Sequence, residues 1–382
     1  MTPSATVGRW RDATSADPHH DDRTAAILGI ALGVCFSVCF ATGLFSHLAQ
    51  HPPGWFHLPA RPAGLYRVTQ GLHVLTGIAA VPLLLAKLWA VFPRLVQWPP
   101  VTSFAHAVER VSLIPLVAGA LFQLWTGLAN IDLWYPLPSF FPTTHYWVAW
   151  ITIGALLVHI GAKWTTTRVA LSRSAVPDEA QAPSSGARRR FLTAVGATSG
   201  LLVATVAGQT ITPLRGLALL APRRPDLGSQ GFPVNKSARS AGVIETAVSA
   251  DYRLRVTGRV ARALTLTAAE LEAWPRHDAV LPIACVEGWS TSRRWSGIRL
   301  RDLLHAAGAP SGSTVSVHSL EGGGLYAVSE VDAAQADDPD TLLALQVDGA
   351  TLSLDHGHPL RLIGPDRPGV MQTKWVTEIR VR

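Results

Sequence analysis

The chain has 382 residues and a formal net charge of +7, with 48% hydrophobic and only 15% charged residues. Charged residues are scarce from Ala25 to Ala162 and frequent after Pro222. This asymmetry excludes a uniformly soluble protein and predicts a membrane part followed by a soluble part. Lys and Arg flank the apolar runs, as the positive-inside rule expects, so we expect no nucleic-acid partner.

Long apolar runs dominate the first half of the chain. Residues 1–24 are polar and predict a disordered cytoplasmic tail. Four runs with at most one charge are long enough to cross a membrane as helices: Ala25–Leu48, Val68–Phe92, Val111–Ile131 and Tyr146–Ala162. They predict a four-helix transmembrane domain over residues 25–168.

A basic linker and a fifth span come next. Residues 169–190 are rich in Pro, Ser, Ala and Arg, and residues 191–213 are predicted to form another transmembrane helix. The sequence Arg188-Arg189-Arg190-Phe191-Leu192 resembles a twin-arginine export signal, which would engage the twin-arginine translocation machinery. A plain basic stop at the cytoplasmic end of the helix explains it equally well, so both interpretations stay open.

The distribution of basic residues predicts the orientation of the spans. Basic residues gather at the ends expected to face the cytoplasm: Lys87, Arg94, Lys163, Arg168, Arg173 and Arg188–Arg190. The loop Asn130–Thr144 has no Lys or Arg and should face outward, whereas Arg61 and Arg67 in another outward loop conflict with the rule. We expect a multi-pass protein of the cytoplasmic membrane with its C-terminal domain on the extracytoplasmic side.

Apolar and polar residues alternate in several segments of residues 231–382, as is typical of a strand-rich domain. Strands are predicted for Tyr252–Val260, Thr314–Ser319, Leu325–Ser329, Leu360–Ile363 and Val376–Val381. Short helices are predicted for Ala268–Trp274, Leu300–Ala307 and Pro339–Leu345. The fold class is therefore multi-domain: an all-α transmembrane bundle of about five spans followed by a mixed α+β, strand-rich domain.

The C-terminal domain contains a single cysteine. Cys285 follows the apolar run Val280–Ala284 and begins the sequence Cys-Val-Glu-Gly-Trp-Ser, so a buried strand delivers a thiol to a glycine-containing turn. A thiolate is a soft metal ligand, and glycine allows a bulky group to approach the backbone. From these residues alone, a buried structural cysteine remains as good an interpretation as a ligand or a nucleophile.

Three spaced motifs resemble the sulfite-oxidase superfamily of molybdopterin enzymes, and more closely its bacterial periplasmic methionine-sulfoxide-reductase type. The first is Cys285–Ser290, which matches that family's Cys-Val-Glu-x-Trp-Ser. The second, His358–Pro365, resembles its Pro-Val-Arg-Leu-Ile-x-Pro segment, and Gln372–Lys374 follows at the spacing of its Gly-Ile-Lys. The segment Phe232–Lys236 also fits the start of the family's domain.

The resemblance implies roles for particular residues. Cys285 would be the thiolate ligand of molybdenum, and Ser319 would take the place of a threonine near the metal. The remaining residues would bind the molybdopterin: Asn235, Lys236, His356, Arg361, Gln372, Thr373 and Lys374. His356 stands where the family often has Asn. Arg293 and Arg294 follow the cysteine turn and would attract an anionic substrate such as sulfite, unless they are only a solvated loop.

Histidines in or near the spans suggest a second cofactor. His145 and His159 are 14 residues apart in the predicted fourth span, which places them on one helix face roughly 21 Å apart. This spacing resembles that of di-haem membrane cytochromes b, in which each haem needs a second histidine. His73 or His47 would be the outer partner and His106 the inner one, although interfacial positions also explain His47, His106 and His145.

The function implied is a membrane-bound molybdopterin-dependent oxidoreductase. It would transfer an oxygen atom to or from a small oxyanion or a sulfoxide. Haem b would pass electrons to or from the quinone pool or another membrane redox partner. The alternative is a membrane cytochrome b-type electron-transfer protein whose soluble domain is a cofactor-free binding module.

Overall fold

The computed structural model describes residues 20–95, 101–135, 141–172 and 185–382, which divide into two compact units. The first, here called the helical unit, comprises Met1–Gly43 and Leu72–Val206. The second, the sheet unit, comprises Leu44–Gly71 and Ala207–Arg382. Residues 1–19 of the predicted tail and 173–184 of the predicted linker lie outside the described residues.

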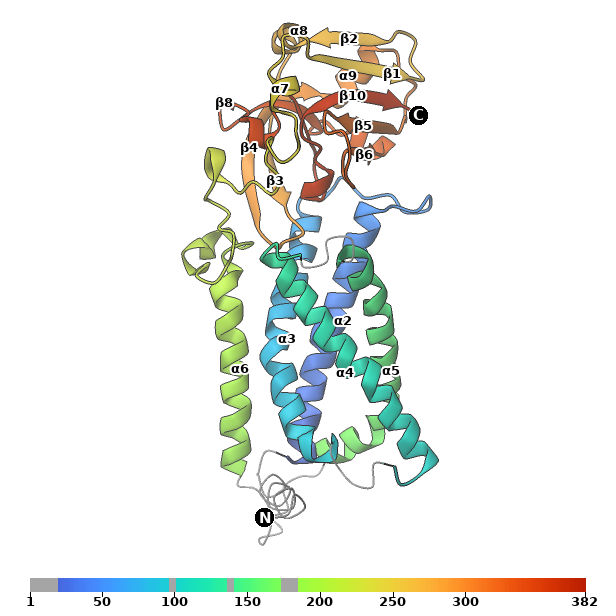
Figure 1. Cartoon of the computed structure of the whole chain (residues 1–382), viewed down its shortest axis with the longest axis vertical. Helices are drawn as coiled ribbons and strands as arrows, with labels where there is room; N and C mark the ends of the chain where they lie inside the picture. Colours follow the sequence, from blue (N-terminus) through green and yellow to red (C-terminus); the bar gives the residue numbers. More distant parts are fainter. Residues whose placement is uncertain (1–19, 96–100, 136–140, 173–184) are drawn as a thin grey trace. The chain divides into compact units, whose positions relative to one another are not determined.

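Five long helices are apolar enough to cross a membrane, which confirms the predicted number of spans. They are α2 (Asp22–Gln50), α3 (Leu65–Leu95), α4 (Phe104–Ile131), α5 (Phe141–Ser172) and α6 (Ser185–Ala207) (Figure 1). The helices α5 and α6 reach into both ends of the predicted linker. The Arg188–Arg190 run is thus part of the first turns of α6.

Small residues let the helices of the helical unit approach one another. The helices α4 and α5 run side by side (Figure 1), and a Cβ added at Gly119 of α4 would lie 2.3 Å from Thr152 Oγ1 of α5. Helix α6 is attached to α3 by a hydrogen bond of 3.2 Å that Ser199 Oγ donates to the carbonyl of Ala79. Close contacts and interhelical hydrogen bonds of this kind hold membrane helices together.

The sheet unit contains two five-stranded sheets. The first has the order β2-β1-β10-β5-β6, formed by β1 (Arg253–Gly258), β2 (Leu264–Thr267), β5 (Val315–Ser319), β6 (Val328–Val331) and β10 (Val376–Val381). Only β1 and β10 pair in parallel in this sheet. The second has the order β3-β4-β7-β8 with β9 also paired to β7: β3 (His277–Ala284), β4 (Ser290–Arg299), β7 (Leu342–Val347), β8 (Ala350–Thr351) and β9 (Arg361–Ile363).

Short helices join these strands. They are α7 (Ile244–Ala247), α8 (Ala268–Ala273), α9 (Leu300–Ala306) and α10 (Ala333–Asp337), with 3-10 turns η1 (Thr212–Leu217), η2 (Ser229–Gly231), η3 (Leu354–His356) and η4 (Gly369–Met371). Helix α8 begins at a capping box in which Thr267 and Glu270 satisfy each other's backbone N–H groups. The strand-rich α+β class predicted for this part of the chain is confirmed.

Strand β7 of the second sheet is buried on both faces, and this overturns one predicted element. Leu343 and Leu345 of β7 pack into one hydrophobic cluster, while Leu342 and Ala344 pack into another on the opposite face. The prediction of a helix at Pro339–Leu345 was therefore wrong. A strand covered on both sides is apolar at every position, so the two-residue alternation that would identify it is missing.

Candidate active site

Cys285 lies in the turn that joins β3 to β4. Its N–H donates to the carbonyl of Trp289 at 2.9 Å, and the N–H of Gly288 donates back to the Cys285 carbonyl at 3.0 Å. Gly288 has a φ of 95°, a conformation that costs glycine little. The turn thereby fixes a cysteine side chain that is only 1% exposed.

The sulfur of Cys285 faces a polar donor. Asn235 Nδ2 donates a hydrogen bond of 2.7 Å to Cys285 Sγ. Burial, and then the charge of Glu287, raise the pKa of the thiol above its ordinary value. A bound metal ion displaces the thiol proton, and the Asn235 amide would then stabilise the thiolate.

Glu287 holds the same turn from within. Its carboxylate accepts a hydrogen bond of 3.0 Å from Trp289 Nε1 and lies 3.0 Å from Arg223 Nε. Burial raises the pKa of Glu287 to about 7, although Arg223 opposes that shift. Neither Glu287 nor Arg223 was predicted to belong to the site.

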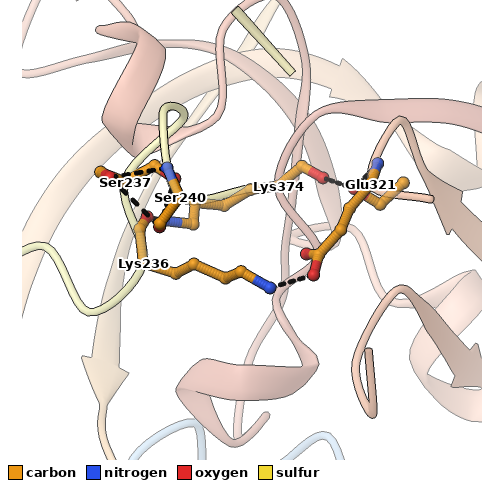
Figure 2. A network of polar contacts seen from close by, with 6 residues as sticks. Lys236, Ser237, Ser240, Glu321 and Lys374 are labelled. Atoms are coloured by element: carbon orange, nitrogen blue, oxygen red, sulfur yellow. Dashed lines mark hydrogen bonds and ion pairs between the residues drawn. The ribbon is translucent and has the colours of Figure 1, made fainter. Parts of the chain in front are cut away.

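Two cations lie close to this turn: Arg361 is buried, and Lys374 is partly buried. Lys374 Nζ donates to the carbonyls of Lys236 at 2.5 Å and Asp355 at 2.8 Å, and Figure 2 shows the first of these bonds. Arg361 is 5% exposed and donates from Nη1 to the His356 carbonyl at 3.1 Å. Its Nε is buried and has no hydrogen-bond partner in the described part of the chain.

The electrostatics of this group favour an anionic ligand. Burial, and then the charge of Arg361, lower the pKa of Lys374 to about 7. Burial likewise lowers the pKa of Arg361 to about 10, and that of His356 to about 4 with Arg361 contributing. A phosphate placed here would offset the cost of desolvation and satisfy the free donor on Arg361.

One short loop connects the sulfur to the cations. The side chain of Asn235 contacts Cys285, and the carbonyl of the next residue, Lys236, accepts from Lys374. Lys236 itself forms an ion pair with Glu321 (Figure 2). These predicted site residues, far apart in the sequence, are therefore brought into one continuous set of contacts.

Other predicted residues lie around the same set. Ser319 Oγ donates to the carbonyl of Lys374 at 2.8 Å, and Thr373 Oγ1 lies 2.6 Å from Ser329 Oγ. Gln372 is 1% exposed, and its Oε1 has no partner among the residues that the structure describes. Such orphaned buried polar atoms fit a site that is completed by a polar cofactor.

The two arginines after the turn are unequal. Arg293 forms an ion pair of 3.1 Å with Asp348 and donates to the Gly231 carbonyl, so its guanidinium is held within the protein. Arg294 is exposed, and only its backbone is tied to Asp348. The predicted attraction of an anionic substrate stays a prediction for both residues.

Segment 44–71, at the ends of α2 and α3, also contributes to this site. Gln70 Nε2 donates to the carbonyl of Val286 at 2.9 Å, directly after the cysteine. Tyr66 is 1% exposed and packs in one cluster with Ala284. Sequence reasoning placed Gln70 inside a predicted span and Tyr66 just before it, and assigned neither residue to the site. The one available signal was the uncharged polar side chains at the ends of apolar runs.

Of the five histidines predicted as haem ligands, two lie together. The rings of His73 in α3 and His145 in α5 have centroids 6.3 Å apart. His73 Nδ1 lies 2.9 Å from the Cys39 carbonyl and His145 Nδ1 lies 2.7 Å from Thr126 Oγ1. Each ring is thus oriented through Nδ1, as metal-binding histidines usually are.

The other three histidines have different surroundings. His47 stacks on His51 with centroids 4.9 Å apart. His106 Nδ1 lies 3.0 Å from Thr102 Oγ1, near the start of α4. His159 is half-buried in α5. Their predicted roles as haem ligands stay predictions.

Parts of this chain are similar to known proteins. Residues 241–382 match the family described as the oxidoreductase molybdopterin binding domain. YedZ1 of Azospira oryzae, provisionally named a protein-methionine-sulfoxide reductase subunit, is 34% identical over 42% of this chain and 61% of its own length. The sulfite oxidase of Gallus gallus is 33% identical over 34% of this chain and 34% of its own length.

Among solved structures, the sulfane dehydrogenase SoxCD from Paracoccus pantotrophus is similar, with 25% identity and a TM-score of 0.32. That match covers 35% of this chain and 38% of the other. The chain thus spans less than two thirds of the length of each of these relatives.

Proposed function

We propose that the chain is a membrane-bound enzyme that transfers an oxygen atom at a molybdenum centre held by Cys285, since residues 241–382 match the oxidoreductase molybdopterin binding domain and part of the chain is similar to sulfite oxidases. The observation that carries the proposal is the single set of contacts that joins Cys285 Sγ, through Asn235 and Lys236, to the partly buried cation Lys374.

The residues of the site divide into two roles. Cys285 would hold the metal, with Asn235 stabilising its thiolate. Arg361 and Lys374 would bind the phosphate of the pterin, because they are cations whose contacts on the protein include carbonyl oxygens. Gln372, Thr373 and Ser319 line the same region, and Gln372 Oε1 is free to accept from the pterin among the described residues.

When bound, the molybdenum cofactor would supply a metal that exchanges an oxygen atom and two electrons with the substrate. The residues of this chain would orient it and exclude water around the sulfur, which is 1% exposed. The names of the relatives suggest two substrate classes, a sulfite-like oxyanion and a sulfoxide. The exposed Arg294 would favour the anion.

The helical unit would carry haem between α3 and α5. A metal–imidazole bond is about 2 Å long, so His73 and His145, with ring centroids 6.3 Å apart, are close enough that they would hold one iron together. Gly43 gives room beside them, because a Cβ there would lie 3.0 Å from His73 Cε1. A second haem at His159 would need His106 or another partner.

The haem proposal is tested by the optical spectrum of the purified protein. His145→Ala should abolish the Soret band of the haem bound by this pair, because one axial ligand is lost. His57→Ala, an exposed histidine in segment 44–71, is the matched control and should leave the spectrum unchanged. An unaltered spectrum in His145→Ala would refute the assignment of this ligand.

The remaining parts of the proposal concern the membrane. Electrons would pass to or from the quinone pool. The sheet unit would lie on the extracytoplasmic side. The Arg188–Leu192 signal would direct its export in a folded state. The five apolar helices support a membrane location. A fusion of the C-terminal residue to a reporter that is active on one side of the membrane only would test the sidedness.

A turnover screen separates this function from the cofactor-free alternative. We expect the membrane protein to oxidise sulfite or reduce methionine sulfoxide, with loss of activity in Cys285→Ala. A haem spectrum in a protein that contains no molybdenum would instead identify a cytochrome with a non-enzymatic soluble domain.

A further inference from the structure

Polar side chains of segment 44–71 form a hydrogen-bonded row inside the sheet unit. Gln50 Nε2 donates to Ser46 Oγ at 3.0 Å, and Ser46 Oγ lies 3.0 Å from the hydroxyl of Tyr66. Ser46 is 9% exposed and Tyr66 is 1% exposed. A buried row of this kind is stable only if each polar group has a partner.

The row ends on a residue of the loop between β5 and β6. The hydroxyl of Tyr326 donates to Gln50 Oε1 at 2.9 Å. An amide oxygen can only accept, so the phenol hydrogen must point toward Gln50. The lone pairs of the Tyr326 oxygen are then left for another donor.

The row starts beside the cysteine turn. Tyr66 packs with Ala284, the residue before Cys285, and hydrogen bonds of about 3 Å lead from Tyr66 through Ser46 and Gln50 to Tyr326. Burial, and then the charge of Cys285, raise the pKa of Tyr326.

Packing alone does not account for the row. Around Tyr66 the cluster is apolar, with Ala49, Leu58 and flanking phenylalanines, so a phenylalanine would fill the same space without a hydroxyl to satisfy. The interaction instead fixes the direction of one phenol hydrogen next to the site.

We propose that Gln50 is a positioning residue for the molybdenum site, which orients the Tyr326 hydroxyl so that its oxygen accepts a hydrogen bond from a ligand of the metal. The inference rests on the proposed function. It makes Gln50, which lies outside the residues matched by the family, a part of the active site.

A double-mutant cycle on the full-length holoprotein tests this inference. Gln50→Leu and Tyr326→Phe should each change the pH dependence of the Mo(V) electron paramagnetic resonance signal in the same direction. With whichever of sulfite and methionine sulfoxide the wild type turns over, each should lower kcat/KM roughly tenfold, the value of one hydrogen bond. The double variant should match Tyr326→Phe, because the two residues act through one interaction.

Two further variants exclude a purely structural effect. Gln50→Glu keeps an acceptor for Tyr326 and should restore the wild-type resonance signal, while His57→Ala should behave as wild type throughout. Two results would overturn this inference and leave the proposed function intact. One is a Mo(V) signal in Gln50→Leu with the pH dependence of the wild type. The other is a fall in kcat/KM that Gln50→Leu causes equally in the wild type and in Tyr326→Phe. A wild-type protein without molybdenum would overturn both.

Discussion

Cations whose contacts on the protein include carbonyl oxygens are the most informative residues of this molecule. Lys374 and Arg361 have lost water without gaining a carboxylate within hydrogen-bonding distance, which lowers the pKa of both. Such an arrangement costs folding free energy in the absence of a ligand. The phosphate of the proposed cofactor would supply the missing negative charge.

The same site predicts an acid-sensitive contribution to stability from His356. Burial lowers the pKa of His356 to about 4 in the folded protein. In the unfolded chain a histidine has a pKa of about 6.5. As the pH falls, His356 is therefore protonated in the unfolded chain before it is protonated in the folded protein. The stability from neutral His356 is therefore present above about pH 6.5 and is lost as the pH falls towards about 4, on the order of 3 kcal/mol in all. His356→Asn should remove this slope from plots of thermal midpoint against pH.

The comparison is made on cofactor-free protein, because a bound anion would change the pKa of the histidine. His305→Asn replaces an exposed histidine of α9 and serves as the control. If the thermal midpoint of His356→Asn still falls as the pH is lowered towards about 4, another group causes this pH dependence.

At the scale of elements, the β3–β4 hairpin determines where the sulfur lies. The turn closes through the bonds between Cys285, Gly288 and Trp289, and β3 is paired with β4 along its whole length. The position of the thiol therefore depends on a single left-handed residue, Gly288.

Gly288→Ala should destabilise the sheet unit by about 1–2 kcal/mol, since an L-residue in the left-handed region is strained by that amount. The thermal midpoint should fall by roughly 2–8 °C, since each 1 kcal/mol shifts the midpoint of a unit of this size by about 2–4 °C. Gly322→Ala is the matched control, because Gly322 lies in a surface loop where an added Cβ meets nothing. Equal midpoints for the two variants would contradict the strain assigned to Gly288.

Sequence patterns predicted most of the elements but only part of the site. Amphipathic strands such as β10 and the five apolar spans were identified because their periodicity or length is distinctive. β7 was missed because both of its faces are buried. Cys285, Arg361 and Lys374 were found through their motif, whereas Gln50 and Tyr326 were not, because contacts between residues 276 positions apart leave no local pattern.

At the scale of the whole molecule, the catalytic part is larger than the family's domain. The sheet unit includes Leu44–Gly71, which contributes Gln70 on the Val286 carbonyl and Arg61 in ion pairs with Asp338 and Asp340. The ends of two apolar helices are therefore built into the same unit as the cysteine. An isolated fragment that begins at residue 207 would lack these contacts, so experiments should use the full chain.

The central claim is that this chain binds molybdopterin through Cys285 and the two cations Arg361 and Lys374. The most direct test is the molybdenum and pterin content of the purified full-length protein, with Arg361→Met and Lys374→Met beside it and the surface variant Arg301→Met as control. We predict stoichiometric metal and pterin in the wild type and in the control, and a loss of both in the two site variants. A folded wild-type protein without molybdenum, or site variants that retain the full content, would contradict the claim.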